Sequence, residues 1–379
     1  MSYSDVLGHR DMAFDPVRNA AYMAALERWV TPDSVVLDLG CGLGSHGLYA
    51  ARLGARKVYL VDPEVVVHVA EEVARANGFG DRVQAFRGTI EEIQLPEQVD
   101  LIISVFTGNI LYSEDLLPSL YLARDRWLRP GGRLIPDFAE LLAAPVSASA
   151  HWRREVATWS DPRHGIDYAG LRRFAPNAMI SVRCDVNDGD APQPLANPIV
   201  LERADFHRAT GTDLDARFEA TISCDGACHG LLTWIRFRCD ETWLETGPAA
   251  TMHWTPQLLP VDPPIEVAAS DRLVGRLLRR TYGEWTWTLR VGSEERRHST
   301  FLGQPLRAKE LAAAAVDATL PLNDQGRVAF DVLQGFATGQ SNGEIAERLC
   351  RDHADRFPRG HEEAMQLVKG LALAYRSIR

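Results

Sequence analysis

The stretch Val35-Val-Leu-Asp-Leu-Gly-Cys-Gly-Leu-Gly44 joins an apolar run, an acidic residue and three closely spaced glycines. Residues 35–39 are β-branched or aliphatic apart from Asp38, which is typical of a strand buried on both faces. The glycines let the backbone turn sharply and let a ligand approach it with no Cβ in the way. We therefore predict a strand that leads into a ligand-binding turn.

A helix from about Ser45 to Leu53 and a second strand over Lys57-Val-Tyr-Leu-Val-Asp62 follow this turn. Asp62 ends that strand about 20 residues beyond the glycines, where a Rossmann-like fold presents a carboxylate to a ribose. The G-x-G-x-G spacing lacks the third-glycine position of the dinucleotide fingerprint, which disfavours NAD and FAD. Two alternatives stay open: a glycine-rich turn without a ligand, and Asp38 as a cap for backbone amides.

The acidic residue, the three glycines and the acidic strand end resemble motif I of the class I methyltransferases. The resemblance implies S-adenosylmethionine as the cofactor, with Asp62 holding the ribose hydroxyls. The cofactor-binding residues that it implies at this motif are Asp38, Gly40, Cys41, Gly42, Gly44 and Asp62.

Composition and charge set limits on the function. The 379 residues predict two to three domains, and contents of 46% hydrophobic and 24% charged residues are ordinary for a globular protein. The net charge of −10 argues against wrapping nucleic acid and is compatible with a cationic peptide substrate. Long apolar stretches and a signal-peptide pattern are missing, which favours a cytoplasmic protein without membrane contact. Among the six cysteines only Cys224 and Cys228 lie close together, and without a second pair they predict no metal site.

The N-terminal segment predicts a helix from about Asp11 to Trp29, with an apolar stripe made of Val17, Ala20, Ala21 and Ala24. The order of His9, Met12, Asp15, Arg18 and Tyr22 resembles the lead-in of protein arginine methyltransferases. That resemblance implies a helix closing over the cofactor, with His9 and Arg18 in contact with it and Arg18 paired with its carboxylate. It also implies that Asp15 orients a catalytic histidine from the far domain. From the sequence pattern alone, Arg18 is equally well a solvated helix residue.

The pattern then alternates as in a doubly wound sheet. A helix over about Pro63 to Asn77 is followed by strands at Val83 to Phe86 and Val99 to Ser104. Between these strands, Gly88-Thr-Ile-Glu-Glu92 resembles the family segment that contacts the adenine, which implies Ile90 and Glu91 as cofactor contacts. An ordinary loop is the alternative.

The loop Ser104-Val-Phe-Thr-Gly-Asn-Ile-Leu-Tyr-Ser-Glu114 resembles the double-glutamate loop with which arginine methyltransferases bind a guanidinium. Glu114 matches the second glutamate and is the implied catalytic carboxylate, whereas Val105 stands where the first is expected. A valine removes one charge and a pair of acceptors, so the methyl-accepting atom stays open. Asp115 is either a partial substitute or a helix N-terminal residue. Val105 and Tyr112 are the predicted substrate-binding residues of this loop.

Beyond about residue 144, runs at Ile199 to Asp205, Ala216 to Ile222 and Leu231 to Phe237 predict antiparallel β structure. The arginine methyltransferase resemblance implies a β-barrel here, interrupted at about residues 152–179 by a helical arm that builds a homodimer. Thr251-Met-His-Trp-Thr-Pro-Gln257 resembles the family's threonine-histidine-tryptophan loop. It implies His253 as the histidine coupled to Asp15, and Trp254 as a wall of the acceptor pocket; a purely structural histidine is the alternative.

The last ~60 residues are predicted to form a separate trihelical domain. The run Leu320-Pro-Leu-Asn-Asp324, an apolar helix and a later Glu-Ile-Ala resemble the small peptide chaperone of pyrroloquinoline quinone synthesis, a winged helix-turn-helix that grips precursor-peptide leaders. Gly339-Gln-Ser-Asn-Gly-Glu-Ile-Ala-Glu-Arg-Leu349 also resembles the LuxR-type DNA-binding motif. Because basic and acidic residues are interleaved here, the peptide interpretation is favoured over DNA. A plain packing or dimer domain is the third alternative.

The sequence thus predicts an α/β fold in four parts. These are cofactor-covering helices at 1–30, a Rossmann-like domain at 31–143, a β-barrel substrate domain at 144–305 and a helix-turn-helix-like domain at 320–379. The predicted function is S-adenosylmethionine-dependent methylation of a peptide or protein, which includes ribosomally made precursor peptides. The competing prediction is a degenerate methyltransferase fold that serves as a scaffold or DNA-binding regulator; the missing glutamate favours it, and motif I, Glu114 and His253 oppose it.

Overall fold

The computed structural model describes residues 6–182, 190–250, 252–313, 315, 317–319 and 321–375. The chain divides into two compact units, Met1–Pro305 and Leu306–Arg379. Each unit has a hydrophobic core of its own, so each is described separately.

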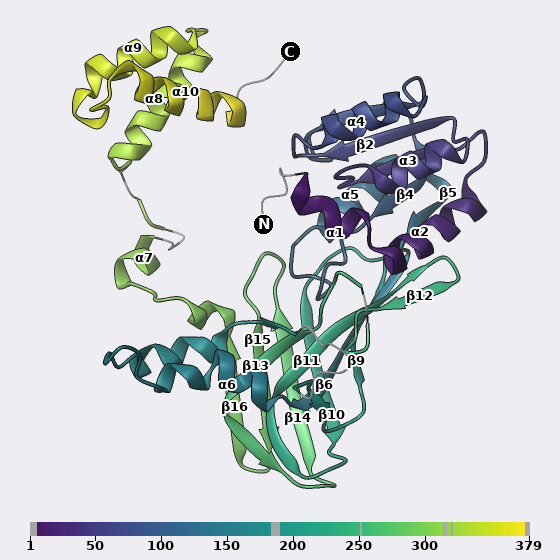
Figure 1. Cartoon of the computed structure of the whole chain (residues 1–379), viewed down its shortest axis with the longest axis vertical. Coiled ribbons are helices and arrows are strands. Elements are labelled where there is room, and N and C mark those ends of the chain that lie inside the picture. Colours follow the sequence, from purple (N-terminus) through teal and green to yellow (C-terminus); the bar gives the residue numbers. More distant parts are fainter. Residues whose placement is uncertain are drawn as a thin grey trace. The chain divides into compact units, whose positions relative to one another are not determined.

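The first unit begins with a five-stranded parallel sheet in the order β3-β2-β1-β4-β5 (Figure 1). Its strands are β1 (Val35–Leu39), β2 (Lys57–Asp62), β3 (Val83–Arg87), β4 (Val99–Ser104) and β5 (Leu128–Ile135). The chain runs outward from β1 to β3 and then returns to the other side of β1, which makes the β1/β4 pair the switch point of the sheet. All five residues of β1 are buried, as its apolar sequence predicts. The predicted Rossmann-like sheet is confirmed.

Helices cover this sheet and its carboxyl edge. They are η1 (Leu7–His9), α1 (Arg10–Ala13), α2 (Pro16–Trp29), α3 (Ser45–Arg52), α4 (Val67–Ala76) and α5 (Leu117–Trp127). The helices α3 and α4 pack on β1 to β3, and α5 packs on β4 and β5.

The single N-terminal helix predicted from the sequence is wrong in two respects. It is broken at Phe14 and Asp15, because the Asp15 side chain caps α2 by accepting from the backbone amides of Val17 and Arg18. Its buried face is also shifted from the predicted stripe, since Val17 is 39% exposed. The buried residues of α2 are Arg18, Asn19, Ala21, Tyr22, Ala25 and Leu26. Because this buried face includes the polar residues Arg18 and Asn19, an apolar stripe did not identify it.

The remainder of the first unit is antiparallel, as predicted. Its strands are β6 (Phe138–Ser147), β7 (Ile180–Ser181), β8 (Gln193–Pro194), β9 (Ile199–Asp205), β10 (Leu214–Thr221), β11 (Gly226–Cys239), β12 (Thr242–Glu245), β13 (Gln257–Val267), β14 (Arg272–Arg279), β15 (Thr286–Val291) and β16 (Glu294–Ser299). One sheet has the order β10-β14-β15-β16, and the other has the order β7-β13-β11-β6-β8 with β9 on β6 and β12 on β11. Helix α2 packs against α3 and also against β11 and β12, so it links the parallel and antiparallel parts (Figure 1).

A helical segment interrupts the antiparallel strands after β6. Its elements are α6 (Ser149–Glu155), η2 (Ala157–Ser160) and η3 (Ala169–Asn177), and a further short helix, η4 (Thr300–Gly303), follows β16. Arg172 on η3 donates two hydrogen bonds to Asp262 on β13, at 2.7 and 3.0 Å. This bidentate pair joins the segment to the sheet.

The second unit is helical. It contains α7 (Ala308–Ala313), α8 (Asp324–Ala337), α9 (Asn342–Asp352), η5 (Ala354–Arg356) and α10 (His361–Tyr375). The small core between α8, α9 and α10 consists of Val328, Val332, Ile345, Ala346, Leu349, Phe357, Ala364 and Val368. Ser341 and Glu344 form a capping box at the start of α9. Three packed helices match the trihelical expectation, but no described residue of this unit lies in a strand, so the expected wing is not seen.

Two further findings limit the function. No helix of the described ranges has the length and apolar character needed to cross a bilayer. The same ranges contain no group of three or more His, Cys, Asp or Glu side chains placed to hold a metal ion.

Candidate functional site

The glycine turn lies at the carboxyl end of β1, at the switch point of the parallel sheet. Gly40, Gly42 and Gly44 have φ values of +67°, +51° and +74°, which side chains rarely adopt. A Cβ at Gly40 would lie 2.3 Å from Cε1 of Phe106, and a Cβ at Gly42 would lie 2.8 Å from Nδ1 of His9. Residues from two distant segments therefore close over the turn, and only glycine fits beneath them.

Two carboxylates support the turn in different ways. Asp62 accepts hydrogen bonds from the backbone amides of Gly42 at 2.8 Å and Glu64 at 2.9 Å. Asp38 accepts from the amide of Gly47, in the first turn of α3, at 2.7 Å. Burial raises the pKa of Asp38 to about 7 against the effect of the Gly47 bond, and nearby Asp62 adds to the rise. Asp38 thus caps one backbone amide, in line with the alternative kept open from the sequence.

Cys41 lies within the turn, and burial raises the pKa of its thiol well above the ordinary value. The side chain is therefore an uncharged thiol, without the thiolate character of a reactive cysteine.

Arg18 lies on the buried face of α2 and is 4% exposed. Its Nη2 donates to the carbonyl of Met12, and its guanidinium carbon lies 5.4 Å from the ring centroid of Trp254. Burial lowers the pKa of the Arg18 guanidinium. Its Nε is buried and has no hydrogen-bond partner among the described residues. Such a donor fits the carboxylate of a bound ligand.

The side chains of Asn19, Tyr22 and His46 fix α2 over the sheet, and the sequence pattern did not predict their contacts. Tyr22 donates to the carbonyl of Ser104 at the end of β4, at 2.9 Å, and stacks on His46 with ring centroids 4.4 Å apart. The His46 Nε2 lies 3.1 Å from Oδ1 of Asn19, and burial lowers the pKa of His46 to about 3, which keeps its ring neutral. The signal in the sequence was the pair of polar residues at 18 and 19, where an apolar face was expected.

Glu114 lies in the loop of residues 105–115, between β4 and α5. Its side chain folds back over Gly108, where an added Cβ would lie 2.7 Å from Oε1. The Glu114 side chain is exposed to solvent, and partial desolvation by the surrounding atoms raises the pKa of its carboxyl, with no charged neighbour among the described residues adding to or offsetting this effect. In the same loop, Tyr112 is buried and Val105 is half-buried against the hydrophobic core.

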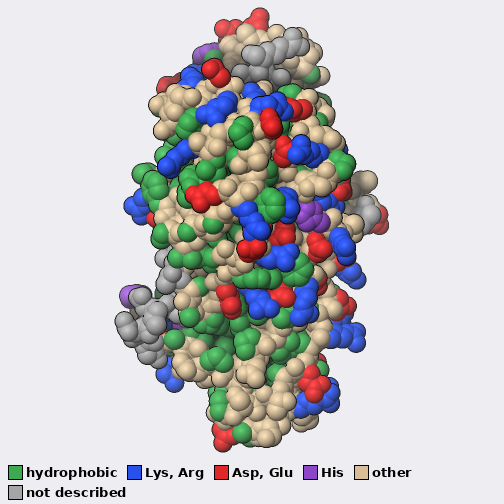
Figure 2. Space-filling model, turned by 90° about the vertical axis from the view of Figure 1, so that its right-hand side faces the viewer, with side chains coloured by type: hydrophobic (Ala, Val, Ile, Leu, Met, Phe, Trp, Pro, Cys, Tyr) green, Lys and Arg blue, Asp and Glu red, His purple; other side chains and the backbone are tan. Residues whose placement is uncertain are grey.

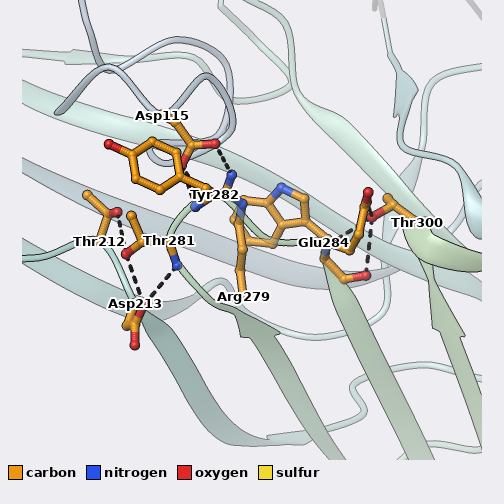
Figure 3. A network of polar contacts seen from close by, with 9 residues as sticks. Asp115, Thr212, Asp213, Arg279, Thr281, Tyr282, Glu284 and Thr300 are labelled. Atoms are coloured by element: carbon orange, nitrogen blue, oxygen red, sulfur yellow. Dashed lines mark hydrogen bonds and ion pairs between the residues drawn. The ribbon is translucent and has the colours of Figure 1, made fainter. Parts of the chain in front are cut away.

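Asp115 pairs with an arginine of the antiparallel part. Figure 3 shows its carboxylate turned toward Arg279 on β14 and toward the backbone of Tyr282. The bond from Nη1 of Arg279 is 2.9 Å long, the bond from the Tyr282 amide is 3.0 Å long, and Nη2 of Arg279 binds the second oxygen. Burial on its own would raise the pKa of Asp115, but these bonds outweigh it and lower the pKa. Asp115 thus forms an ion pair with Arg279. It is not the helix N-terminal residue considered from the sequence, because α5 begins at Leu117.

Replacing Arg279 by methionine is expected to lower the free energy of unfolding by about 3 kcal/mol, because it leaves the Asp115 carboxylate without its cation. Urea unfolding measures this loss. Arg280→Met is the matched control. This substitution breaks the ion pair between Arg280 and Asp213, whose side chains are 72% and 52% exposed, respectively. It should lower the free energy of unfolding by less than about 1 kcal/mol. Equal losses for the two variants would contradict a structural role for the Arg279 pair.

Residues 252–256 meet two other segments of the site. The backbone amide of His253 donates to Oδ2 of Asp15 at 2.7 Å, and the amide of Thr255 donates to Oδ1 of Asn109 at 2.9 Å. Asp15 therefore meets His253 through the backbone, and no bond joins its carboxylate to the imidazole in this structure. Asn109 ties the loop of residues 105–115 to this one, and nothing in the sequence pattern singled it out.

Trp254 and an open depression border this junction. Trp254 is buried and packs edge-on against Phe237, with ring centroids 5.4 Å apart. The depression has a volume of about 320 Å³. Its lining residues are Arg10, Asp11, Phe14, Asp15, Pro16, Met252 and His253.

The predicted adenine contacts lie after β3. Ile90 is 1% exposed, and Oε1 of the exposed Glu91 accepts from the Ser119 hydroxyl of α5 at 2.6 Å. Glu91 thus lies against the first turns of α5, whereas the motif I residues, Asp15 and Arg18 meet at the end of β1.

Two family models match the chain. One is described as a methyltransferase domain and matches residues 36–132, and the other is described as an arginine methyltransferase oligomerization subdomain and matches residues 137–287. Neither model reaches the helical second unit.

Curated relatives point to the same family. The chain is 30% identical over 287 residues to protein arginine N-methyltransferase 6 of Danio rerio, covering 73% of this chain and 82% of the relative. It is 33% identical over 251 residues to protein arginine N-methyltransferase 2 of Dictyostelium discoideum, covering 64% of this chain. The match spans 48% of that relative, about half its length. The chain is also 38% identical over 239 residues to probable protein arginine N-methyltransferase 6.1 of Oryza sativa subsp. indica, and the match covers 62% of each protein.

Solved structures share the fold. The first unit resembles the Trypanosoma brucei PRMT1 enzyme-prozyme heterotetrameric complex with AdoHcy, at a TM-score of 0.69 and 26% identity, covering 79% of this chain and 99% of the other. It also resembles Arabidopsis thaliana protein arginine methyltransferase 10, at a TM-score of 0.66 and 24% identity, covering 79% of this chain and 99% of the other.

Proposed function

The chain belongs to the protein arginine N-methyltransferase family, and from that premise we propose that it transfers a methyl group from S-adenosylmethionine to a side chain of a peptide or protein. The observation that carries the proposal is the convergence at the end of β1. There the glycine turn, Asp62 and the unpartnered Nε of Arg18 lie beside the loop that bears Glu114, whose Phe106 lies against Gly40.

The residues at this edge fit the cofactor. Arg18 would pair with its carboxylate and Asp62 would accept from its ribose hydroxyls, while Asp38 supports the turn from behind. The turn itself, Gly40 to Gly44 with Cys41, and the covering His9 would enclose it, and Ile90 with Glu91 would contact the adenine. When bound, the cofactor supplies an electrophilic methyl group on a sulfonium.

The protein has three tasks in this reaction: to orient the acceptor, to exclude water and to take up one proton. Glu114 is the proposed proton acceptor, because the pKa of its carboxyl is raised and no cation among the described residues pairs with it. Trp254, Tyr112 and Val105 are the proposed acceptor contacts. A proton relay from the His253 imidazole to Asp15 would require the imidazole to turn toward the Asp15 carboxylate. In this structure that carboxylate accepts from the backbone amide of His253.

The pH dependence of turnover follows from Glu114. Burial raises the pKa of this carboxyl, and only its ionised form accepts a proton. Activity is therefore expected to fall as the pH drops through a value above the usual ~4.3 for glutamate. A plot of kcat against pH tests this, since an acid limb at or below the usual value would contradict a base with a raised pKa.

Calorimetry with S-adenosylmethionine tests the proposed function. The intact protein is expected to bind the cofactor, and mass spectrometry is expected to show the gain of a methyl group on a peptide substrate. If a folded protein bound no cofactor, the chain would be the non-enzymatic scaffold kept as the alternative.

The quaternary state and the location complete the proposal. The helical segment Ser149 to Asn177 stands where the oligomerization subdomain model matches, which supports a homodimer built through it. Light scattering of the intact protein and of a variant lacking this segment tests the dimer. The cytoplasmic location predicted from the sequence is part of the same proposal.

The second unit is the proposed binding domain for the leader of a precursor peptide. Its separation from the first unit supports the idea, as do apolar side chains exposed on α8 and α10, with Phe330 at 56%. Figure 2 shows basic and acidic side chains interspersed on one face of the molecule. In the sequence of the second unit, basic and acidic residues are likewise interleaved, which favours a peptide over DNA.

Removing residues 306–379 is expected to raise KM for a full-length precursor by about tenfold or more, because a tethered leader raises the local concentration of the core peptide. Turnover of a leaderless peptide should stay the same, which makes it the internal control. Phe330→Ser, at an exposed position, should reproduce part of the loss. Unchanged kinetics on the full-length precursor would rule out leader capture.

A further inference from the structure

Provided that the chain binds S-adenosylmethionine as proposed above, its contacts to the cofactor come from two separate pieces of the chain. The glycine turn and Asp62 belong to the parallel sheet, whereas Arg18 lies on α2, which packs on α3 and on the antiparallel part (Figure 1). Arg18 can meet a carboxylate bound at the turn only if α2 keeps its position relative to that turn. A contact between α2 and the element that follows the turn would fix this position.

His46 makes such a contact from the first turn of α3. Helix α3 begins at Ser45, directly after Gly44, so His46 lies two residues beyond the last glycine of the turn. Its Nε2 lies 3.1 Å from Oδ1 of Asn19, and both residues are buried. Asn19 follows Arg18 in the chain and lies with it on the buried face of α2. A buried hydrogen bond therefore joins the glycine turn to the helix that carries Arg18.

The neighbours of this pair fix the direction of the bond. Nδ2 of Asn19 donates to the carbonyl of Ala13, the last residue of α1, at 2.7 Å, so the amide oxygen faces His46. That oxygen can only accept, and the His46 Nε2 must therefore carry the proton that it donates. Burial and the nearby charge of Arg18 both lower the pKa of His46, which keeps the ring neutral. The bond thus requires a donor at position 46 that adds no charge beside Arg18.

Tyr22 makes a second contact between α2 and His46. The two rings are stacked, with an angle of 17° between their planes. The Tyr22 hydroxyl donates to the carbonyl of Ser104, at the end of β4, which pairs with β1 in the parallel sheet. Asn19 and Tyr22 are three residues apart and therefore lie on the same face of α2. The imidazole is held by both of them, so α2 has little freedom to rotate or slide over the turn.

We propose that His46 is a positioning residue for cofactor binding: it holds α2 in register with the glycine turn, so that Arg18 is in place before the cofactor arrives. Ordering a charged side chain ahead of binding removes part of the entropy that binding would otherwise cost. Without the bond, the amide oxygen of Asn19 would be left buried and unpaired, which is unfavourable. Helix α2 would then shift to give that oxygen a partner, and Arg18 would move with it.

Two ligands separate this role from a general effect on the fold. S-adenosylhomocysteine has the carboxylate that Arg18 is proposed to bind, whereas 5′-methylthioadenosine has the nucleoside and the sulfur but no carboxylate. Calorimetry measures the affinity of the full-length protein for each ligand. His46→Phe keeps an aromatic ring for Tyr22 but removes the donor. It is expected to weaken the binding of S-adenosylhomocysteine about tenfold, as for a buried group left unpaired, and to leave the binding of 5′-methylthioadenosine unchanged.

Three further variants complete the comparison. His46→Gln still presents an uncharged N–H donor to Asn19 and is expected to recover most of the loss. Asn19→Leu removes the same bond from the side of α2, without placing a larger ring at position 46, and should reproduce the loss. Tyr49→Phe is the matched control: the Tyr49 hydroxyl donates to Glu27 and also joins α3 to α2, but in an exposed pair. Its affinity for both ligands should stay within about twofold of the wild type.

An Arg18→Ala background tests whether His46 acts through Arg18. If it does, His46→Phe should cause no further loss of affinity for S-adenosylhomocysteine once Arg18 has been removed, because the two substitutions then act on the same contact.

Each outcome bears on a different proposal. If the wild-type protein binds neither ligand, the proposed function fails, and the role of His46 with it. If the protein binds S-adenosylhomocysteine but His46→Phe and Asn19→Leu bind it equally well, the cofactor site stands and the positioning role is overturned. Equal losses for the two ligands, or a further loss in the Arg18→Ala background, would also overturn that role, because they would assign His46 to the stability of the fold in general.

Discussion

Replacing Glu114 by glutamine is expected to lower kcat by about a hundredfold to ten-thousandfold, which is the usual contribution of a positioned general base. Glutamine keeps the size of the side chain and still accepts a hydrogen bond, but it cannot take a proton. Cofactor affinity should stay the same, because Glu114 belongs to the loop after β4 and not to the glycine turn. Single-turnover kinetics and calorimetry measure the two effects separately.

Glu202→Gln is the matched control for this variant. Glu202 on β9 is a partly buried glutamate whose pKa is also raised, by burial; it acts on Tyr112 through its charge but lies outside the loop of residues 105–115. Its replacement should leave kcat within about twofold, as is usual for substitutions away from the reacting groups. A similar loss of kcat in both variants would mean that burial of a glutamate, rather than its place beside the acceptor, explains the effect.

Replacing Asp62 by alanine is expected to weaken the binding of S-adenosylmethionine by about a hundredfold. Two effects combine: the ribose hydroxyls lose a charged acceptor, worth about 1.5 to 3 kcal/mol per bond, and the amides of Gly42 and Glu64 lose the carboxylate that holds them. Calorimetric titration of the cofactor measures the loss.

Asp62→Asn separates these two effects. Asparagine can still accept from one amide of the turn but lacks the charge, so about a tenfold loss is expected, smaller than for alanine. The melting temperature without cofactor shows whether the turn has collapsed. Cofactor affinity that is unchanged in the alanine variant would remove Asp62 from the site.

Much of the fold follows from local pattern. The apolar run of β1 and the helix and strand patterns that alternate after it specify a parallel sheet, because the strands β1, β2 and β4 are buried on both faces and the connections are short. The positive φ angles of Gly40, Gly42 and Gly44 were likewise predictable, since other residues rarely adopt them.

The hydrophobic pattern of the sequence did not predict which helix face is buried where that face contains polar groups. The stripe predicted for the first helix included Val17, yet the buried face contains Arg18 and Asn19, whose partners lie in other segments. The wing expected of the last domain is not seen among its described residues: the expectation rested on a resemblance of the helices, and residues 308–313 before them form the alanine-rich helix α7.

The sequence by itself determined the turn at which we propose that the cofactor binds, because a strand, a glycine turn and a following carboxylate are contiguous and their geometry is local. It also showed that Val105 removes a charge from the acceptor loop. Only the tertiary structure decided what remains around Glu114. Arg279 lies 164 residues from Asp115 in the chain, and their pairing depends on the packing of β14 against the loop after β4. The charge left at a site depends on such distant contacts, and no local pattern encodes them.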